Sequence, residues 1–186
     1  MNVLPKNRYH VYNQENNNKR LFNKDNHYHF LLELFQAYIS HYCDTICWCL
    51  IPNHFHFLVH NDTRVSEIKK QGGLLIDPVN NGFRKLLSAY SHTYNLQNDR
   101  TGALFRPKTK SKCLTNEAAL AETGLSDTAY FTKCFHYIHN NPVAVGLVTQ
   151  PEEWKWSSLR LYVGKRENSF CNKELAYKFI GIEKLT

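Results

Sequence analysis

Two short apolar segments, residues 45–51 and 55–60, flank Pro52 and Asn53 and set the strongest limit on how this chain can fold. Segments of this length that are rich in aromatic and β-branched residues are typical of strands, and Pro-Asn is a turn signal. The sequence therefore predicts two antiparallel strands joined by a tight turn. Because such a pair is only marginally stable alone, the elements around it decide the fold class.

Before and after this pair, the sequence predicts a strand, a helix and a loop. Residues 8–13 are rich in strand-forming types and alternate along the chain, as in a half-buried strand. Apolar residues between positions 25 and 42 recur at three- and four-residue spacing, which predicts an amphipathic helix with Asp25 or Asn26 as its N-cap. The polar, glycine-bearing residues 62–81 predict a loop excursion.

The second half of the chain completes a recognisable order of elements. Helical spacing resumes over residues 83–94, and residues 103–114 predict a last strand. Helices are expected near residues 117–122 and over 127–141, the second ended by Pro142, which lacks an amide donor. The order strand, helix, strand, strand, helix, strand is the split β-α-β of a ferredoxin-like α+β fold. We expect an antiparallel sheet with helices on one or both faces and a helical C-terminal extension.

Length and composition fit one basic globular domain. The chain has 186 residues, of which 42% are hydrophobic, and 23 Lys and Arg against 16 Asp and Glu give a formal charge of +7. This length suits a single domain, and the apolar content excludes a disordered basic tail. We expect one domain over residues 1–186, with a core at about 8–150 and the extension at about 151–186.

The absence of targeting signals and the spacing of the cysteines predict a cytoplasmic protein. The sequence has no apolar run long enough to span a membrane and no secretory signal at its start. Its six cysteines include no Cys-x-x-Cys pair, so reduced thiols are expected. Cys47 and Cys49 fall in a predicted buried strand and are interpreted as small apolar residues, because zinc ligands are spaced differently.

Two segments carry residue types suited to chemistry. On the predicted strand 55–60 and the residue before it, His54 and His56 point to one face, so their imidazoles form half of a metal site. A bare His-x-His is more often a pair of polar residues on a solvated strand face. On the later helix, Tyr137 and Asn141 are four residues apart and share a face. Taken alone, Tyr137 is more simply interpreted as a half-buried tyrosine.

Several motifs in a fixed order favour a functional interpretation of these residues over a structural one. They are Tyr-His-Val-Tyr-Asn at 9–13, Ile-Pro-Asn-His-Phe-His-Phe-Leu-Val at 51–59, Gly-Ala-Leu-Phe-Arg at 102–106, Tyr-Ile-His-Asn-Asn-Pro-Val-Ala-Val-Gly-Leu-Val at 137–148 and Trp-Lys-Trp-Ser-Ser at 154–158. Over residues 8 to 162, the chain closely resembles the REP-associated tyrosine transposases, a branch of the single-tyrosine HUH transposases. Ordered motifs at such spacing are far more specific than any one of them.

The resemblance implies a metal-dependent endonuclease and strand transferase, a transposase, that acts on single-stranded DNA. It implies that His54 and His56 bind a divalent metal, Mg²⁺ or Mn²⁺, with Asn141 as the third ligand where related families use Gln. It implies that Tyr137 is the nucleophile and forms a 5′-phosphotyrosine, with Tyr130 as the alternative. The implied partner is single-stranded DNA or the hairpin of a palindromic repeat, bound by a monomer or homodimer in the cytoplasm, in association with the nucleoid.

Part of the basic excess is expected to contact DNA phosphates. Four basic residues alternate along the predicted strand 103–114, so all four are expected on one face: Arg106, Lys108, Lys110 and Lys112. A row of cations can neutralise several phosphates and release their counterions, although a solvated strand face is an equal alternative without the resemblance. Arg84 and Lys85 are further candidates for phosphate contact.

Other interpretations of the sequence remain open. Four histidines are interpreted as bystanders, with the two beside Tyr137 open to contact with DNA: His10, His92, His136 and His139. The alternative to an enzyme is a catalytically inactive protein of the same fold that binds DNA hairpins. A small metal-binding or RNA-processing protein of ferredoxin-like fold is a third class, and it leaves the Tyr137 motif unexplained.

Overall fold

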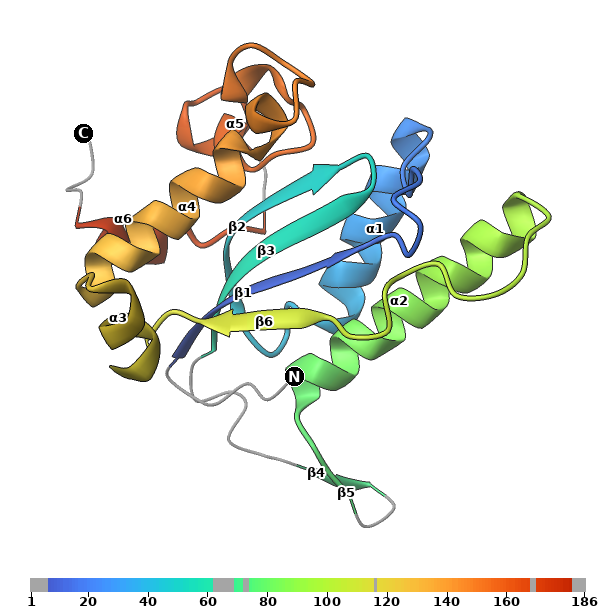
Figure 1. The fold of residues 1–186 in the computed structure, drawn as a ribbon, viewed down its shortest axis with the longest axis horizontal. Helices are drawn as coiled ribbons and strands as arrows, with labels where there is room; N and C mark the ends of the chain where they lie inside the picture. Colours follow the sequence, from blue (N-terminus) through green and yellow to red (C-terminus); the bar gives the residue numbers. More distant parts are fainter. Residues whose placement is uncertain (1–6, 62–68, 72–73, 116, 168–169, 182–186) are drawn as a thin grey trace.

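The computed structural model describes residues 7–61, 69–71, 74–115, 117–167 and 170–181 (Figure 1). The strands are β1 (Asn7–Gln14), β2 (Asp44–Ile51), β3 (His54–Asn61), β4 (Lys69–Gln71), β5 (Leu74–Ile76) and β6 (Lys110–Cys113). The α-helices are α1 (Asp25–Tyr38), α2 (Pro78–Gln97), α3 (Glu117–Thr123), α4 (Asp127–Ala144), α5 (Leu159–Tyr162) and α6 (Lys173–Ile180), with a 3-10 turn at Pro151–Glu153.

Four strands form an antiparallel sheet in the order β2-β3-β1-β6. The first strand therefore lies between the third and the last, as in a ferredoxin-like fold. Figure 1 shows α1 and α2 on one side of this sheet and α4 crossing the other side. The short strands β4 and β5 pair with each other apart from the sheet. The predicted α+β class is confirmed.

Successive side chains of β3 point to opposite faces of the sheet, and each face packs against its own apolar core. Phe55 and Phe57 point toward α1 and α2, and the ring of Phe57 stacks on Phe35 of α1 with the ring centroids 4.0 Å apart. On the other face, Leu58 and the buried thiols of Cys47 and Cys49 pack in the core that α4 covers. His54 and His56 share this α4 face, as the alternation predicted.

A C-terminal segment covers the β2 edge of the sheet. Leu50 N donates to Trp156 O at 2.9 Å, and Ser158 N donates to Trp48 O at 2.9 Å. Ser157 bridges to Cys49 between these two bonds. The edge of β2 therefore has hydrogen-bond partners supplied by the same chain.

The starts and ends of α1 and α2 differ from those expected. Helix α1 ends at Tyr38 rather than near residue 42, and its N-cap is Lys24, which makes no side-chain capping bond. Helix α2 begins at Pro78 because the side chain of Asp77 caps it, accepting from the amides of Val79 and Asn80. The loop excursion expected over residues 62–81 therefore ends earlier, before Pro78. Residues 62–68 and 72–73 of that excursion lie outside the described residues.

Proline explains two further differences. Pro142 lies inside α4, which continues to Ala144, so the expectation that it ends the helix is wrong. It removes one amide donor only, and the helix closes with Val145 N bonded to Asn141 O at 3.1 Å. The last strand is four residues long, because Pro107 interrupts the expected run and has no amide to pair. None of the described helices combines the length and apolar character that a membrane crossing needs.

Gly82 of α2 packs against the end of α1 and generates the first prediction. A Cβ at this position would lie 2.3 Å from Tyr38 O and 2.9 Å from Ile39 Cγ1. We expect Gly82→Ala to lower the free energy of unfolding by about 1–3 kcal/mol, although Ala is the better helix former. Urea denaturation measures this change. Ser88→Ala, at an exposed site of the same helix, should shift it by less than about 0.5 kcal/mol. Equal midpoints for the two variants would contradict the close packing.

Candidate active site

Strand β3 and helix α4 bring together the three side chains that the sequence singled out. Asn141 Oδ1 lies 3.3 Å from His54 Nε2, and Asn141 Nδ2 lies 3.1 Å from His56 Nε2. The two imidazole rings stand on the same face of the sheet, 5.0 Å apart between centroids. The Nε2 atoms of both histidines therefore face one amide group.

Both histidines also have a polar neighbour at Nδ1. His54 Nδ1 lies 2.6 Å from Asn53 Oδ1, in the turn between β2 and β3. His56 Nδ1 lies 2.8 Å from His10 Nε2, on the neighbouring strand β1. Each ring is thus held at both of its nitrogens, which fixes its orientation on the sheet.

Burial keeps these imidazoles neutral. It lowers the pKa of His56 well below the ordinary value, and the nearby His10 and His54 act in the same direction. Burial also lowers the pKa of His54, against the raising effect of its hydrogen bond to Asn141. Burial and Lys112 lower the pKa of His10 to about 4. Since a protonated imidazole has no free lone pair, the low pKa values favour metal binding at neutral pH.

The donor atoms suit a divalent cation. In the described residues, no three His, Cys, Asp or Glu side chains are arranged to hold a metal ion. The set that can do so consists of the Nε2 atoms of His54 and His56 and the amide oxygen of Asn141. Two imidazole nitrogens and one amide oxygen are ligand types for a divalent cation, and three protein donors leave coordination positions open for a substrate.

Tyr137 lies beside these candidate metal ligands and is exposed to solvent, whereas Tyr130 is buried. The Tyr137 side chain is 54% exposed, and its ring centroid lies 5.7 Å from that of His56 and 6.0 Å from that of His10. Tyr130 is 7% exposed, and Lys112 Nζ sits 5.2 Å above its ring. An external substrate can therefore reach the hydroxyl of Tyr137 more easily.

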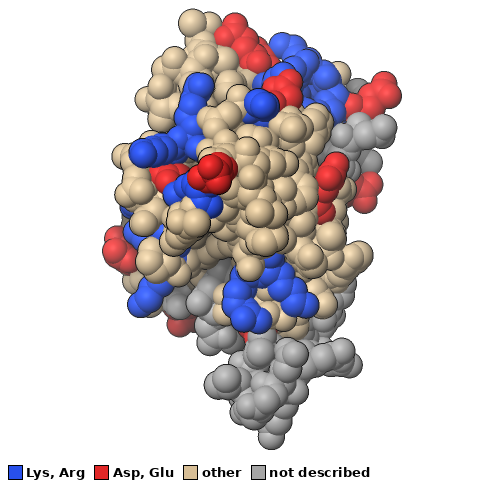
Figure 2. Space-filling view, turned by 90° about the vertical axis from the view of Figure 1, so that its right-hand side faces the viewer, with Lys and Arg blue, Asp and Glu red and all other residues tan. Residues whose placement is uncertain are grey.

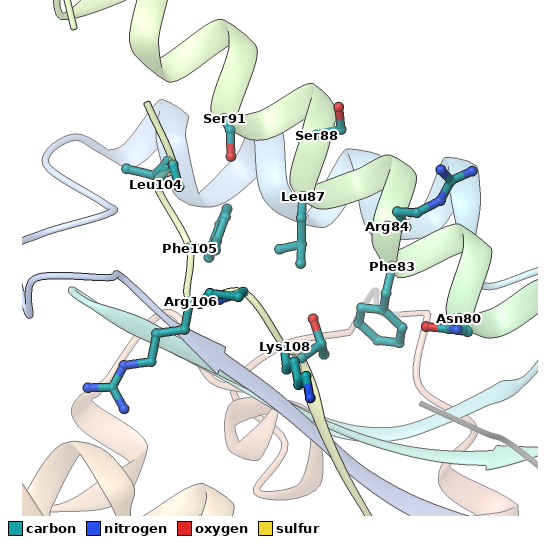
Figure 3. Close-up of a pocket in the computed structure, with 13 residues that line it drawn as sticks. Asn80, Phe83, Arg84, Leu87, Ser88, Ser91, Leu104, Phe105, Arg106 and Lys108 are labelled. Atoms are coloured by element: carbon teal, nitrogen blue, oxygen red, sulfur yellow. The ribbon is translucent and has the colours of Figure 1, made fainter. Parts of the chain in front are cut away.

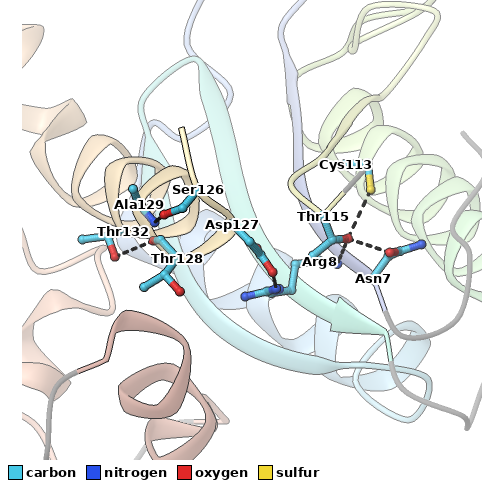
Figure 4. A network of polar contacts seen from close by, with 9 residues as sticks. All are labelled: Asn7, Arg8, Cys113, Thr115, Ser126, Asp127, Thr128, Ala129 and Thr132. Atoms are coloured by element: carbon cyan, nitrogen blue, oxygen red, sulfur yellow. Dashed lines mark hydrogen bonds and ion pairs between the residues drawn. The ribbon is translucent and has the colours of Figure 1, made fainter. Parts of the chain in front are cut away.

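An ion pair fixes the N-terminal end of α4 (Figure 4). Arg8 of β1 pairs with Asp127 in the first turn of the helix. The guanidinium carbon of Arg8 also lies 5.4 Å from the ring centroid of Phe131 and 4.4 Å from that of Phe179 on α6. These contacts join β1, α4 and α6, and they limit how α4 can slide over the sheet.

His139 fixes the same helix near its middle. Its side chain is 2% exposed, and its Nε2 lies 2.9 Å from Ser158 Oγ. The same hydroxyl accepts from Trp48 N at 2.9 Å and donates to Trp48 O at 3.1 Å. The expectation that His139 is open to DNA is therefore wrong, because it is buried between α4 and the segment that covers β2. His136 is exposed.

The six basic candidates do not form one row. Lys112 and Lys110 of β6 pair with His10 and Tyr12 of β1. Since directly opposed residues of an antiparallel pair share a face, both lysines lie on the α4 side of the sheet. Arg106 precedes β6, where the chain is irregular, so the expected alternation along one strand is wrong. Two of the four cations therefore share the face of the candidate site.

The other basic candidates lie beside α2. A cleft of about 630 Å³ separates this helix from residues 103–109, and Arg84, Arg106 and Lys108 are among its lining residues. Figure 3 shows the charged ends of Arg84 and Arg106 pointing away from each other. Lys85 is exposed on the same helix. In Figure 2, basic side chains form separate groups with acidic ones between them, so the net charge is not gathered into one patch on that face.

The overall fold is similar to that of a solved structure. The structure of a REP-associated tyrosine transposase bound to a REP hairpin matches with a TM-score of 0.57 and 16% sequence identity, covering 91% of this chain and 87% of the other. At this identity, the likeness establishes a shared fold. No family model and no curated protein sequence matches the chain.

Sequence reasoning missed two residues at this site. His10 was interpreted as a bystander, yet its ring contacts His56 and stands 6.0 Å from Tyr137. Its position in the alternating segment 9–13 places it on one face with Tyr12, which was the available signal. His139 has no comparable signal, because its partner Ser158 comes from a segment whose pairing with β2 follows only from the fold.

Ser158 generates the second prediction. Ser158→Ala removes the hydroxyl that contacts His139 and the backbone of Trp48, leaving buried polar groups without partners. We expect the free energy of unfolding to fall by about 1–3 kcal/mol, measured by urea denaturation. Thr132→Ala removes an exposed hydroxyl bond within α4 and should change it by less than about 0.5 kcal/mol. Equal losses in both variants would show that Ser158 does not anchor α4.

Proposed function

We propose that this protein is a metal-dependent transposase that cuts and rejoins single-stranded DNA through Tyr137. The observation that carries the proposal is the pairing of an exposed tyrosine with the half-buried His54 and the buried His56 and Asn141 beside it. All of these groups come from one chain, so the proposal needs no second copy to complete the site. The shared fold with a REP-associated tyrosine transposase supports the same activity.

The residues have distinct roles in the proposed reaction. The hydroxyl oxygen of Tyr137 attacks the scissile phosphorus, the bond between phosphorus and the 3′-oxygen breaks, and the hydroxyl proton is transferred overall to that oxygen. The products are a 5′-phosphotyrosine and a free 3′-hydroxyl, and the reverse step rejoins the strand. His54, His56 and Asn141 would hold a divalent ion, which when bound polarises the phosphate and assists the leaving oxygen. The unperturbed pKa of a tyrosine is about 10, so the nucleophile needs such assistance.

Basic residues supply the proposed contacts with DNA. Lys110 and Lys112 share a sheet face with His10, which supports the proposal that they bind phosphates of the strand near Tyr137. Arg84, Arg106 and Lys108 line the cleft beside α2 and would contact more distant phosphates, as in the stem of a hairpin. The competing function, hairpin binding without catalysis, shares these contacts but gives no role to the exposed hydroxyl of Tyr137.

The third prediction tests the nucleophile. A labelled single-stranded oligonucleotide carrying the repeat that flanks the gene is incubated with protein and Mn²⁺, and denaturing electrophoresis detects a covalent adduct. We expect the wild-type chain and Tyr130→Phe to form the adduct and Tyr137→Phe to form none, because Tyr137 is exposed beside the metal set and Tyr130 is buried. An undiminished adduct in Tyr137→Phe refutes the assignment. A wild-type chain that binds the hairpin without forming an adduct supports the non-catalytic alternative.

The fourth prediction tests the phosphate contacts. Each lost contact with single-stranded DNA reduces the magnitude of the negative slope of log K against log salt by about 0.7, so Lys110→Gln with Lys112→Gln should reduce it by about 1.4. Fluorescence anisotropy at several salt concentrations measures the slope. Lys178→Gln on α6 removes an exposed charge of the same kind and should leave the slope unchanged. Equal slopes for the double variant and wild type would place the DNA elsewhere.

A further inference from the structure

We propose that His10 is a positioning residue that holds His56 in the tautomer that metal binding requires. The inference rests on the metal site proposed above and adds a residue that does not touch the metal. His10 lies on β1, where its Cα is paired with that of Leu58, and its side chain reaches the ring of His56 from the strand next to β3.

The contact between the two rings is short and buried. His10 Nε2 lies 2.8 Å from His56 Nδ1, and both side chains are buried. The rings are stacked with centroids 5.0 Å apart, and Tyr12 stacks against His10 at 4.8 Å. Packing by Tyr12 and the backbone of β1 therefore fixes the direction in which His10 Nε2 points.

One proton has to lie between these two nitrogens. The nitrogen that carries it determines whether His56 Nε2 can bind a metal ion. If the proton is on His56 Nδ1, the Nε2 atom of that neutral ring is bare and faces Asn141 as a metal ligand. If the proton is on His10 Nε2, the neutral His56 carries its own proton on Nε2, where it blocks a metal ion. Metal binding thus requires His10 to accept, with its own proton on Nδ1.

The other histidine of the pair has an equivalent arrangement. Asn53 Oδ1 lies 2.6 Å from His54 Nδ1, and an amide oxygen can only accept a hydrogen bond. Asn141 Oδ1 lies 3.3 Å from His54 Nε2 and is an acceptor as well, so metal binding requires the proton of His54 to lie on Nδ1, in the shorter contact with Asn53. With both protons on Nδ1, donated to Asn53 and to His10, the two Nε2 lone pairs are free to bind one metal ion.

The chemical type of the acceptor fits a site that admits DNA. Metal-bound histidines commonly donate to a carboxylate, a backbone carbonyl or a water. A carboxylate at position 10 would add a negative charge beside the phosphates that must approach Tyr137, whereas a neutral imidazole accepts the same hydrogen bond without that charge. His10 therefore orients the ligand without repelling the proposed substrate.

The fifth prediction uses two substitutions of His10. His10→Gln can place an amide oxygen near the position of Nε2 and keep the acceptor, whereas His10→Phe keeps a ring against Tyr12 and removes it. His92→Phe, at an exposed site on α2, is the control. Circular dichroism and thermal unfolding of each purified full chain establish that it is folded. Two measurements then follow, both without DNA and neither dependent on catalysis.

Nitrogen-15 NMR of the metal-free protein reports the tautomer of His56, and electron paramagnetic resonance of free Mn²⁺ reports its dissociation constant. We expect the Nδ1–H tautomer in wild type, His10→Gln and His92→Phe, and its loss in His10→Phe. We expect Mn²⁺ binding to weaken about 10–100-fold in His10→Phe and to stay within about threefold of wild type in the other two.

Different results overturn different parts of the proposal. Wild-type Mn²⁺ affinity in folded His10→Phe, or equal weakening in His10→Gln and His10→Phe, refutes the role of His10 as acceptor. An Nε2–H tautomer of His56 in the metal-free wild type refutes it independently. A wild-type chain that binds no Mn²⁺ refutes the proposed metal site, while the tautomer measurement still shows whether His10 accepts from His56.

Discussion

The eight-residue antiparallel register between β1 and β3 places the parts of the candidate site next to one another. It sets His10 beside His56, and the pairing of β1 with β6 then sets Lys112 beside His10. A shift of one residue would turn His10 to the opposite face and replace it with Tyr9 or Val11, both of which belong to the core under α1 and α2. The apolar residues that are buried under α1 and α2 therefore also determine which polar residues lie on the opposite face of the sheet.

Helix α4 has to keep a fixed position for this geometry to matter. It supplies Tyr137 and Asn141, which lie two residues before and two residues after His139, the residue bonded to Ser158. The ion pair of Arg8 with Asp127 holds the opposite end of the helix. Because the two anchors are about 12 residues apart, and a helix rises about 1.5 Å per residue, they restrain α4 over roughly 18 Å of its length.

Local periodicity explains which parts of the site were predictable from sequence. Alternation on β3 placed His54 and His56 together, and the four-residue spacing placed Tyr137 and Asn141 together, because both patterns depend on one element each. The partnership of His10 with His56 depends on the register of two strands, and that of His139 with Ser158 depends on a tertiary contact. The expected row of four cations failed because the chain is irregular around Pro107 and β6 begins only at Lys110.

The coverage of β2 by residues 156–158 has a consequence for how copies of this chain can meet. An uncovered edge strand is a template on which another chain can extend the sheet, but the amide of Leu50 and the carbonyl of Trp48 are already bonded to this segment. The opposite edge is β6, which is only four residues long and carries two lysines. Both edges of the four-stranded sheet thus disfavour the joining of two copies by strand pairing through this sheet.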